Sequence, residues 1–140
     1  MEVATSTYNM TPNEIEKLER ACIDYLYIVL KTKEDPDFYP FAKRCLQNHL
    51  TTNLCNTNSY FTGKTSTESL KLPKSKRTKE HHYGMTRLAE DLLALKNPTA
   101  SSIKLEILNK GTFNLTTSNE NMILRNNNQD YNSISPMITY

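Results

Sequence analysis

The sequence predicts an α+β fold, with helices at the N-terminus and a mixture of strands and helices in the C-terminal half. Residues 11–50 hold two stretches with the start and stop signals of helices. Short alternating runs bounded by Thr, Asn and Ser follow later in the chain. The length of 140 residues suits one domain, which we place at 11–140 behind a disordered leader at 1–10.

The first helix is predicted to begin after Thr11 and to run to about Lys31. Thr11 and Glu14 have the spacing of a capping box, and Pro12 takes the first helical position, where its missing N–H costs nothing. Apolar residues then recur at helical spacing. The charged, proline-containing run at 33–37 ends the helix.

A second helix is predicted at residues 39–50. One side of it would carry Phe41, Ala42, Cys45, Leu46 and His49. His49 would then lie near the C-terminal end of the helix, where a partial positive charge is favourable. This placement accounts for His49 without a catalytic role.

The middle of the chain is polar and weakly periodic. Residues 51–73 are rich in Thr, Asn and Ser, with one short strand expected at 59–62. A third helix is expected at 83–95, where leucines recur at helical spacing. Residues 101–108 alternate and fit either a strand or a short helix, and 113–115 fits a strand.

The C-terminal part begins with a second capping-box pattern, formed by Thr117 and Glu120, which predicts a short helix to about Arg125. Residues 126–130 are expected to be disordered because they are uniformly polar. The tail is apolar enough to dock back on the core through Ile134, Met137, Ile138 and Tyr140.

Charge and cysteine content narrow the classes of partner. The net charge is only +2, but basic residues gather between Lys64 and Arg87 beside two histidines. Three cysteines, without a secretory signal, favour an intracellular location. No apolar run approaches the roughly 20 residues that a membrane span needs. Lys74, Lys76, Arg77 and Lys79 would suit the phosphates of nucleic acid.

Glu80, His81 and His82 combine the groups needed for metal-assisted hydrolysis of a phosphodiester. A histidine moves protons near neutral pH, and an adjacent carboxylate offers oxygen to a divalent cation. The alternative is a charged loop with two exposed histidines. In an extended chain Glu80 and His82 would share a face and His81 would point to the other, so sequence leaves open which histidine is the base.

Asn121 is the second candidate ligand. It lies one residue beyond the capping-box Glu120, near the start of a predicted helix, and could offer its carbonyl oxygen to a metal. The capping box by itself explains Thr117 and Glu120 without any function.

Considered together, the segments "KRTKEH" (76–81) and "TSNENMIL" (117–124) resemble small HNH-like endonucleases of tailed phages. The resemblance implies a ββα-metal motif at about 74–126 and cleavage of nucleic acid, most simply DNA. It implies that His81 is the general base and that Glu80 and Asn121 bind Mg²⁺ or Mn²⁺ in preference to Zn²⁺. Asn109 and Asn114 are both candidates for its middle residue. Arg87 could stabilise the transition state, and His82 is a possible additional site residue.

The sequence also departs from that family. His82 stands where an aliphatic residue is common, the helix at 83–95 would be an insertion, and the zinc-binding Cys-x-x-Cys pairs of many members are absent. The rival prediction is therefore a small, non-enzymatic protein, viral or not, that binds nucleic acid or a host protein through its basic loop. If phage-encoded, either protein would work in the host cytoplasm. A dimer is one open possibility for its assembly.

Overall fold

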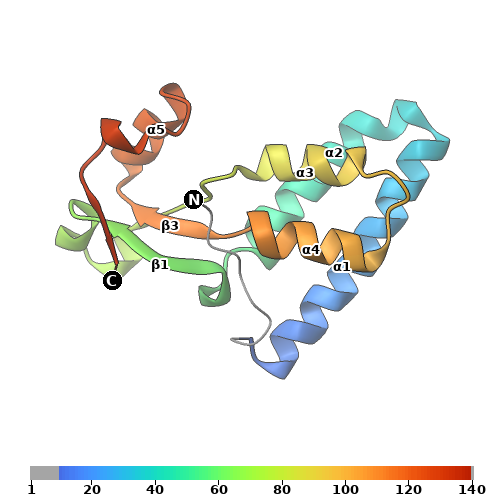
Figure 1. Ribbon diagram of the computed structural model, residues 1–140, viewed down its shortest axis with the longest axis horizontal. Coiled ribbons are helices and arrows are strands. Elements are labelled where there is room, and N and C mark those ends of the chain that lie inside the picture. Colours follow the sequence, from blue (N-terminus) through green and yellow to red (C-terminus); the bar gives the residue numbers. More distant parts are fainter. Residues whose placement is uncertain (1–9, 140) are drawn as a thin grey trace. The chain divides into compact units, whose positions relative to one another are not determined.

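A computed structural model describes residues 10–139 of the protein (Figure 1). Within them the chain forms two compact units. The helical unit consists of residues 10–60 and 83–112, and the sheet unit of residues 61–82 and 113–139. The predicted leader lies outside the described residues except for Met10, which is buried. The placement of one domain over 11–140 stays a prediction.

Helix α1 (Pro12–Glu34) opens the helical unit and confirms the predicted start. The Thr11 hydroxyl accepts from the Glu14 backbone N–H, and the Glu14 carboxylate accepts from the Thr11 N–H. Asp35 caps the end of the helix, which runs three residues beyond Lys31. A 3-10 turn at Pro36–Phe38 then leads into the second helix.

The other helices of this unit are α2 (Tyr39–His49), α3 (Met85–Ala94) and α4 (Ala100–Lys110). Helix α1 packs against α4, and α2 packs against α3. A π-helical turn at Leu50–Leu54 extends α2. The predicted helices at 39–50 and 83–95 are thus confirmed, with slightly different ends.

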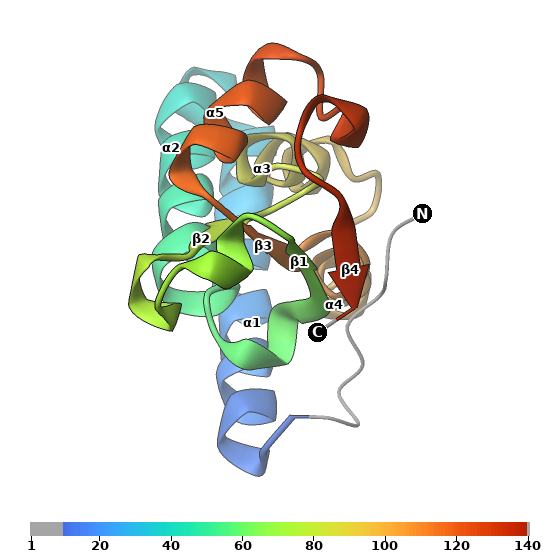
Figure 2. The ribbon, with the colours of Figure 1, turned by 90° about the vertical axis from the view of Figure 1, so that its left-hand side faces the viewer.

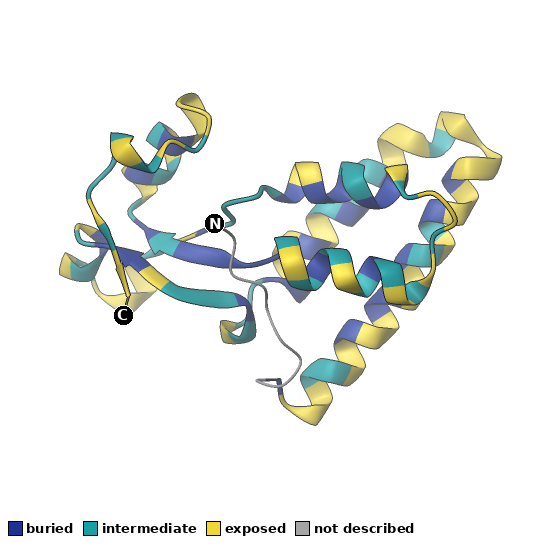
Figure 3. Cartoon of the chain, in the orientation of Figure 1, coloured by how far each residue is buried: buried dark blue, intermediate teal, exposed yellow. Residues whose placement is uncertain are grey.

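Residues 101–108 resolve as a helix because α4 has its own capping box, between Thr99 and Ser102. Ile103 and Ile107, one helical turn apart, are fully buried, whereas Leu105 is 61% exposed. Phe41 departs from prediction in the same way. It is 55% exposed, because Ala42 and Leu46 mark the buried side of α2. Buried and exposed residues alternate in the same way along α1 (Figure 3).

The sheet unit is built on a four-stranded mixed sheet of order β2-β3-β1-β4 (Figure 2). Its strands are β1 (Phe61–Ser66), β2 (Thr78–Glu80), β3 (Phe113–Thr116) and β4 (Met137–Thr139). Strand β3 runs parallel to β1 and antiparallel to β2, and β4 runs antiparallel to β1. The strand predicted at 113–115 is confirmed. The one predicted at 59–62 begins only at Phe61, because Asn58–Tyr60 forms a 3-10 turn.

Strand β3 leads through Thr117 directly into helix α5 (Ser118–Asn126), whose capping box was predicted. Residues 126–130 are not disordered as expected. They form a turn in which Asn128 and Gln129 have positive φ and the Gln129 N–H donates to the Leu124 carbonyl at 2.8 Å. The tail returns to the sheet through backbone pairing of β4 with β1, but Ile138 is 40% exposed and does not dock as expected, and Tyr140 lies outside the described residues.

Among residues 10–139, no helix has both the length and the apolar character needed to cross a membrane.

Candidate functional site

The antiparallel pairing of β2 and β3 places Glu80 directly opposite Asn114. The Asn114 side-chain amide donates to Oε1 of Glu80 at 3.4 Å. From the next strand, the Thr62 hydroxyl donates to Oδ1 of Asn114 at 2.5 Å. Three neighbouring strands therefore contribute one continuous row of polar side chains. Of the two candidates for the middle residue, Asn114 contacts Glu80, while Asn109 lies on α4 in the helical unit.

Tyr131 completes this row from the C-terminal part of the chain. Its hydroxyl donates to Oε1 of Glu80 at 2.7 Å and accepts from the Asn114 amide at 3.1 Å. Sequence reasoning missed this residue and assigned the tail only to packing. No local signal could have found it, because it meets Glu80 from a turn 51 residues away.

The environment of Glu80 is unusual for a carboxylate. The residue is 1% exposed, and its Oε2 has no hydrogen-bond partner among the described residues. Burial raises the pKa of Glu80, against the opposing effect of the hydrogen bonds from Tyr131 and Asn114. One oxygen is thus held by the protein, and the other is a buried acceptor that can take a proton or a cation.

His81 follows the last residue of β2 and points away from this polar row. Its ring lies 5.5 Å from the ring of Phe113, and Lys79 places its ammonium 5.3 Å from the same ring. Phe61 stacks on Phe113 at 5.6 Å. Lys79 and His81 thus reach Phe113 while Glu80 between them reaches Asn114, as strand alternation requires. His81 is half-buried on an aromatic platform of Phe61 and Phe113.

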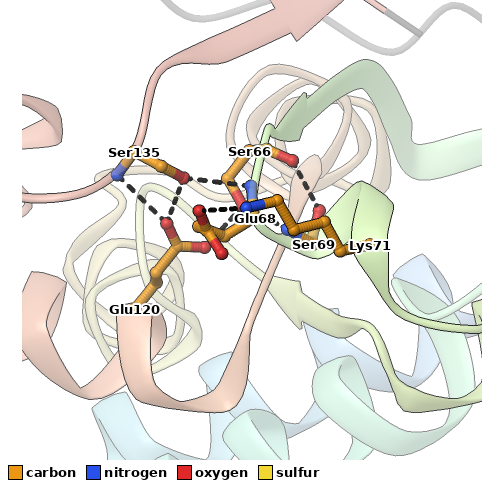
Figure 4. Close-up of polar contacts among 6 residues, drawn as sticks. All are labelled: Ser66, Glu68, Ser69, Lys71, Glu120 and Ser135. Carbon is orange, nitrogen blue, oxygen red and sulfur yellow. Dashed lines mark hydrogen bonds and ion pairs between the residues drawn. The ribbon is translucent and has the colours of Figure 1, made fainter.

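Glu120 fixes the start of α5. It accepts from the Thr117 backbone N–H at 3.0 Å, from the Ser66 hydroxyl, and from both the N–H and the hydroxyl of Ser135. Figure 4 shows its carboxylate among these serines. Burial alone would raise the pKa of Glu120, but hydrogen bonds from Ser135, Ser66 and Thr117 together lower it. The capping box is therefore part of a larger buried network.

Asn121, the next residue, is half-buried on α5, a helix in contact with β2. Its backbone N–H donates to the Thr117 carbonyl at 2.9 Å. Its side chain makes no hydrogen bond to another residue in the described range 10–139. The structure thus brings Glu80 and Asn114 into contact but gives Asn121 no hydrogen bond to either.

The predicted phosphate-binding residues differ in how exposed their side chains are. Lys74 and Lys76 are exposed in a 3-10 turn, and Lys79 is exposed on β2. Arg77 instead donates from Nε to the Leu72 carbonyl at 3.1 Å and is half-buried. The lysines are accessible to a polyanion, whereas Arg77 is partly used in holding the loop.

Arg87 belongs to the helical unit, where its guanidinium lies 4.3 Å from the ring of Tyr83. The Tyr83 hydroxyl donates to Asp91, which also pairs with Lys110 at 2.9 Å. Arg87 therefore has a packing role within its own unit. His82 is half-buried in the segment that joins β2 to the helical unit.

The donor atoms favour a hard cation over zinc. No group of three or more His, Cys, Asp and Glu side chains in the described part of the chain could hold a metal ion. Mg²⁺, however, commonly binds through one or two carboxylates and keeps several waters. Oε2 of Glu80 is an oxygen donor of this kind, but its burial leaves it no exposed surface for those waters.

Comparison of the chain with protein-family models, curated proteins and solved structures finds no match.

Proposed function

We propose that the sheet unit is a divalent-metal-dependent nuclease that hydrolyses phosphodiester bonds in nucleic acid, most simply DNA. The observation that carries this proposal is the order of elements around Glu80. Strand β2 pairs antiparallel with β3, and β3 leads directly into helix α5, while α3 and α4 lie between β2 and β3 along the chain. Glu80 and His81 come from the end of the first strand and Asn114 from the second. This is the order that the resemblance to HNH-like endonucleases implies.

In this proposal Glu80, through Oε2, and Asn121 would hold Mg²⁺ or Mn²⁺, which requires the buried Glu80 carboxylate to become accessible to the ion. When bound, such a cation supplies charge stabilisation to the phosphate and the leaving oxygen. Asn114 and Tyr131 fix the orientation of the Glu80 carboxylate through its other oxygen.

His81 would take the proton from the attacking water, a role for which a histidine suits neutral pH. This role requires the His81 ring to turn from the Phe113 face toward the face that carries Glu80. The Phe113 ring limits the orientations open to the imidazole. The exposed Lys74 and Lys76 bind backbone phosphates outside the reacting centre. Arg87 has no assigned step, because its guanidinium is stacked on Tyr83.

A second candidate function is nucleic-acid binding without cleavage. It is favoured by the burial of Glu80 and its raised pKa, which also suit a neutral, structural acid in the polar row. The Lys74–Lys76 turn would then be an electrostatic binding surface only.

Plasmid nicking tests the choice between them. The nuclease proposal predicts nicking with Mg²⁺ or Mn²⁺ and none with EDTA. Asn121→Ala should reduce the rate at least about tenfold, whereas Asn119→Ala, an exposed residue on the same helix, should leave it unchanged. Retention of DNA binding with no nicking in any metal would favour the second candidate.

A further inference from the structure

Helix α1 exposes three large apolar side chains on the side opposite its buried face. Ile23, Tyr27 and Leu30 are 61%, 73% and 44% exposed. At 3.6 residues per turn they lie roughly opposite Leu18 and Val29, which are fully buried. Single exposed apolar side chains are ordinary, whereas a continuous row of them marks an interaction surface.

This surface has the spacing of a seam between two helices. Ile23, Tyr27 and Leu30 follow one another at intervals of four and three residues, and the exposed Arg20 and Glu34 continue the same alternation at the two ends. The α1 row therefore comprises Arg20, Ile23, Tyr27, Leu30 and Glu34. A partner helix that fits it needs an apolar centre with an acid facing Arg20 and a base facing Glu34.

The α1 row of a second copy, running in the opposite direction, meets these needs. A two-fold axis beside Tyr27 brings the two Tyr27 rings together and sets Ile23 of each copy beside Leu30 of the other. The same axis sets Arg20 of each copy beside Glu34 of the other. The row is thus complementary to itself in shape and in charge.

The charges also select the direction of pairing. The exposed Asp24 and Lys31 flank the row on one side and would form two further ion pairs across the same axis. A parallel pair would instead set Arg20 against Arg20 and Glu34 against Glu34, and such like-charge contacts are strongly unfavourable. Arg20 now pairs with Glu16 at 3.2 Å, but both side chains are exposed, so a change of partner costs little.

The length of α1 suits a modest interface. The helix has 23 residues and is about 34 Å long, and a two-fold axis repeats every contact on its other side. A lipid surface fits the row less well. Helices that lie on membranes carry Lys and Arg along their polar face, whereas Glu16, Glu19 and Asp24 are exposed on α1.

We propose that α1 is the interface of a two-fold symmetric dimer of this chain, in which the two α1 rows pack antiparallel. The proposal does not depend on the proposed function, because α1 belongs wholly to the helical unit and Glu80 to the sheet unit.

Sedimentation equilibrium of the full-length protein across the micromolar range tests the dimer. The unmodified protein should show a monomer–dimer equilibrium. Tyr27→Asp places two like charges at the axis and should raise the dimer Kd at least about tenfold. Leu105→Asp is the matched control, because Leu105 is also 61% exposed but lies on α4, and it should leave the Kd unchanged. Circular dichroism checks that each variant keeps its helices.

Charge reversal tests the antiparallel arrangement. Arg20→Glu and Glu34→Arg should each raise the Kd at least about tenfold, and the double variant should restore it to near the unmodified value. The proposal is overturned if the unmodified protein is a monomer at every concentration, which would leave the row to a different protein. It is also overturned if Tyr27→Asp dimerises as the unmodified protein does, or if the double variant is no better than the single ones.

Discussion

The hydroxyl of Tyr131 lies 2.7 Å from Oε1 of Glu80, joining a turn near the end of the chain to the end of strand β2. The bond holds one oxygen of a fully buried carboxylate and leaves the other without a protein partner among the described residues. Buried acceptors of this kind are costly unless something satisfies them. A proton can satisfy Oε2, and the raised pKa of Glu80 favours the protonated form.

The free protein should become less stable as the pH rises above the ordinary pKa of Glu80. Burial raises that pKa from 4.5 in the folded state, so the folded chain holds this proton more tightly than the unfolded chain. Its stabilising contribution is therefore complete below about pH 4.5 and is lost as the pH rises through the folded pKa. Urea unfolding in EDTA across this range should show the loss in the unmodified protein and not in Glu80→Gln. Superimposable pH profiles would contradict the assignment.

Glu120 should behave in the opposite sense. Its pKa is lowered, so its contribution is present above the ordinary pKa of 4.5 and is lost as the pH falls through the folded value. Replacing Glu120 by Gln puts a donor beside the Ser135 N–H and should cost about 1–3 kcal/mol at pH 7.

The matched control is Glu68→Gln, an exposed residue whose ion pair with Lys71 should contribute less than about 1 kcal/mol. Urea denaturation at pH 7 and at pH 3 compares the two variants. Equal losses at pH 7 would show that the Glu120 network does not stabilise the sheet unit.

Gly111→Ala should destabilise the helical unit by about 1–3 kcal/mol. The backbone φ of Gly111 is −88°, which any residue adopts, so the cost is steric. An added Cβ would lie 2.7 Å from the Ile107 carbonyl oxygen and 2.9 Å from Sγ of Cys55. A double-mutant cycle with Cys55→Ala tests this explanation. Gly111→Ala should cost less stability in the Cys55→Ala background than in the unmodified protein, because Cys55→Ala removes Sγ, one of the two close atoms. Strict additivity would contradict this explanation.

The basic turn should contribute to the salt dependence of DNA binding. Replacing both Lys74 and Lys76 by Ala should lower the slope of log K against log salt by about 1 for each phosphate that the protein no longer neutralises. Lys33→Ala, an exposed lysine on α1, should leave the slope unchanged. Fluorescence anisotropy with a labelled duplex, repeated over a range of salt concentrations, measures DNA binding by both variants. An unaltered slope in the double variant would place the binding surface elsewhere.

The sequence predicted those helix starts whose capping residues lie close together in the chain. The capping boxes of Thr11 and Thr117 fixed two helix starts, because both partners of each box lie within one turn. The alternation at 101–108 was ambiguous, since Ile103 and Ile107 fit either period. The capping box between Thr99 and Ser102 starts a helix there, and it was not recognised because Ser takes the place of the usual Glu.

The candidate site could be predicted only in part. Glu80 and His81 were identified from their chemistry, and Asn114 was one of two alternatives. Tyr131 and Phe113 were not predicted as site residues, because their contacts depend on long-range strand pairing and on the return of the chain after α5. His81 lies on the face opposite Glu80, as strand alternation predicted for an extended chain.

The two adjacent histidines allow the most direct test of the nuclease proposal. Single-turnover cleavage of a labelled duplex in Mn²⁺ should be compared for the unmodified protein, His81→Ala and His82→Ala, with DNA binding and melting temperature measured on each. We predict that His81→Ala slows cleavage about 10²- to 10⁴-fold with DNA binding intact, as expected for loss of a general base, and that His82→Ala stays within a few fold. Cleavage by His81→Ala at the unmodified rate would contradict the account.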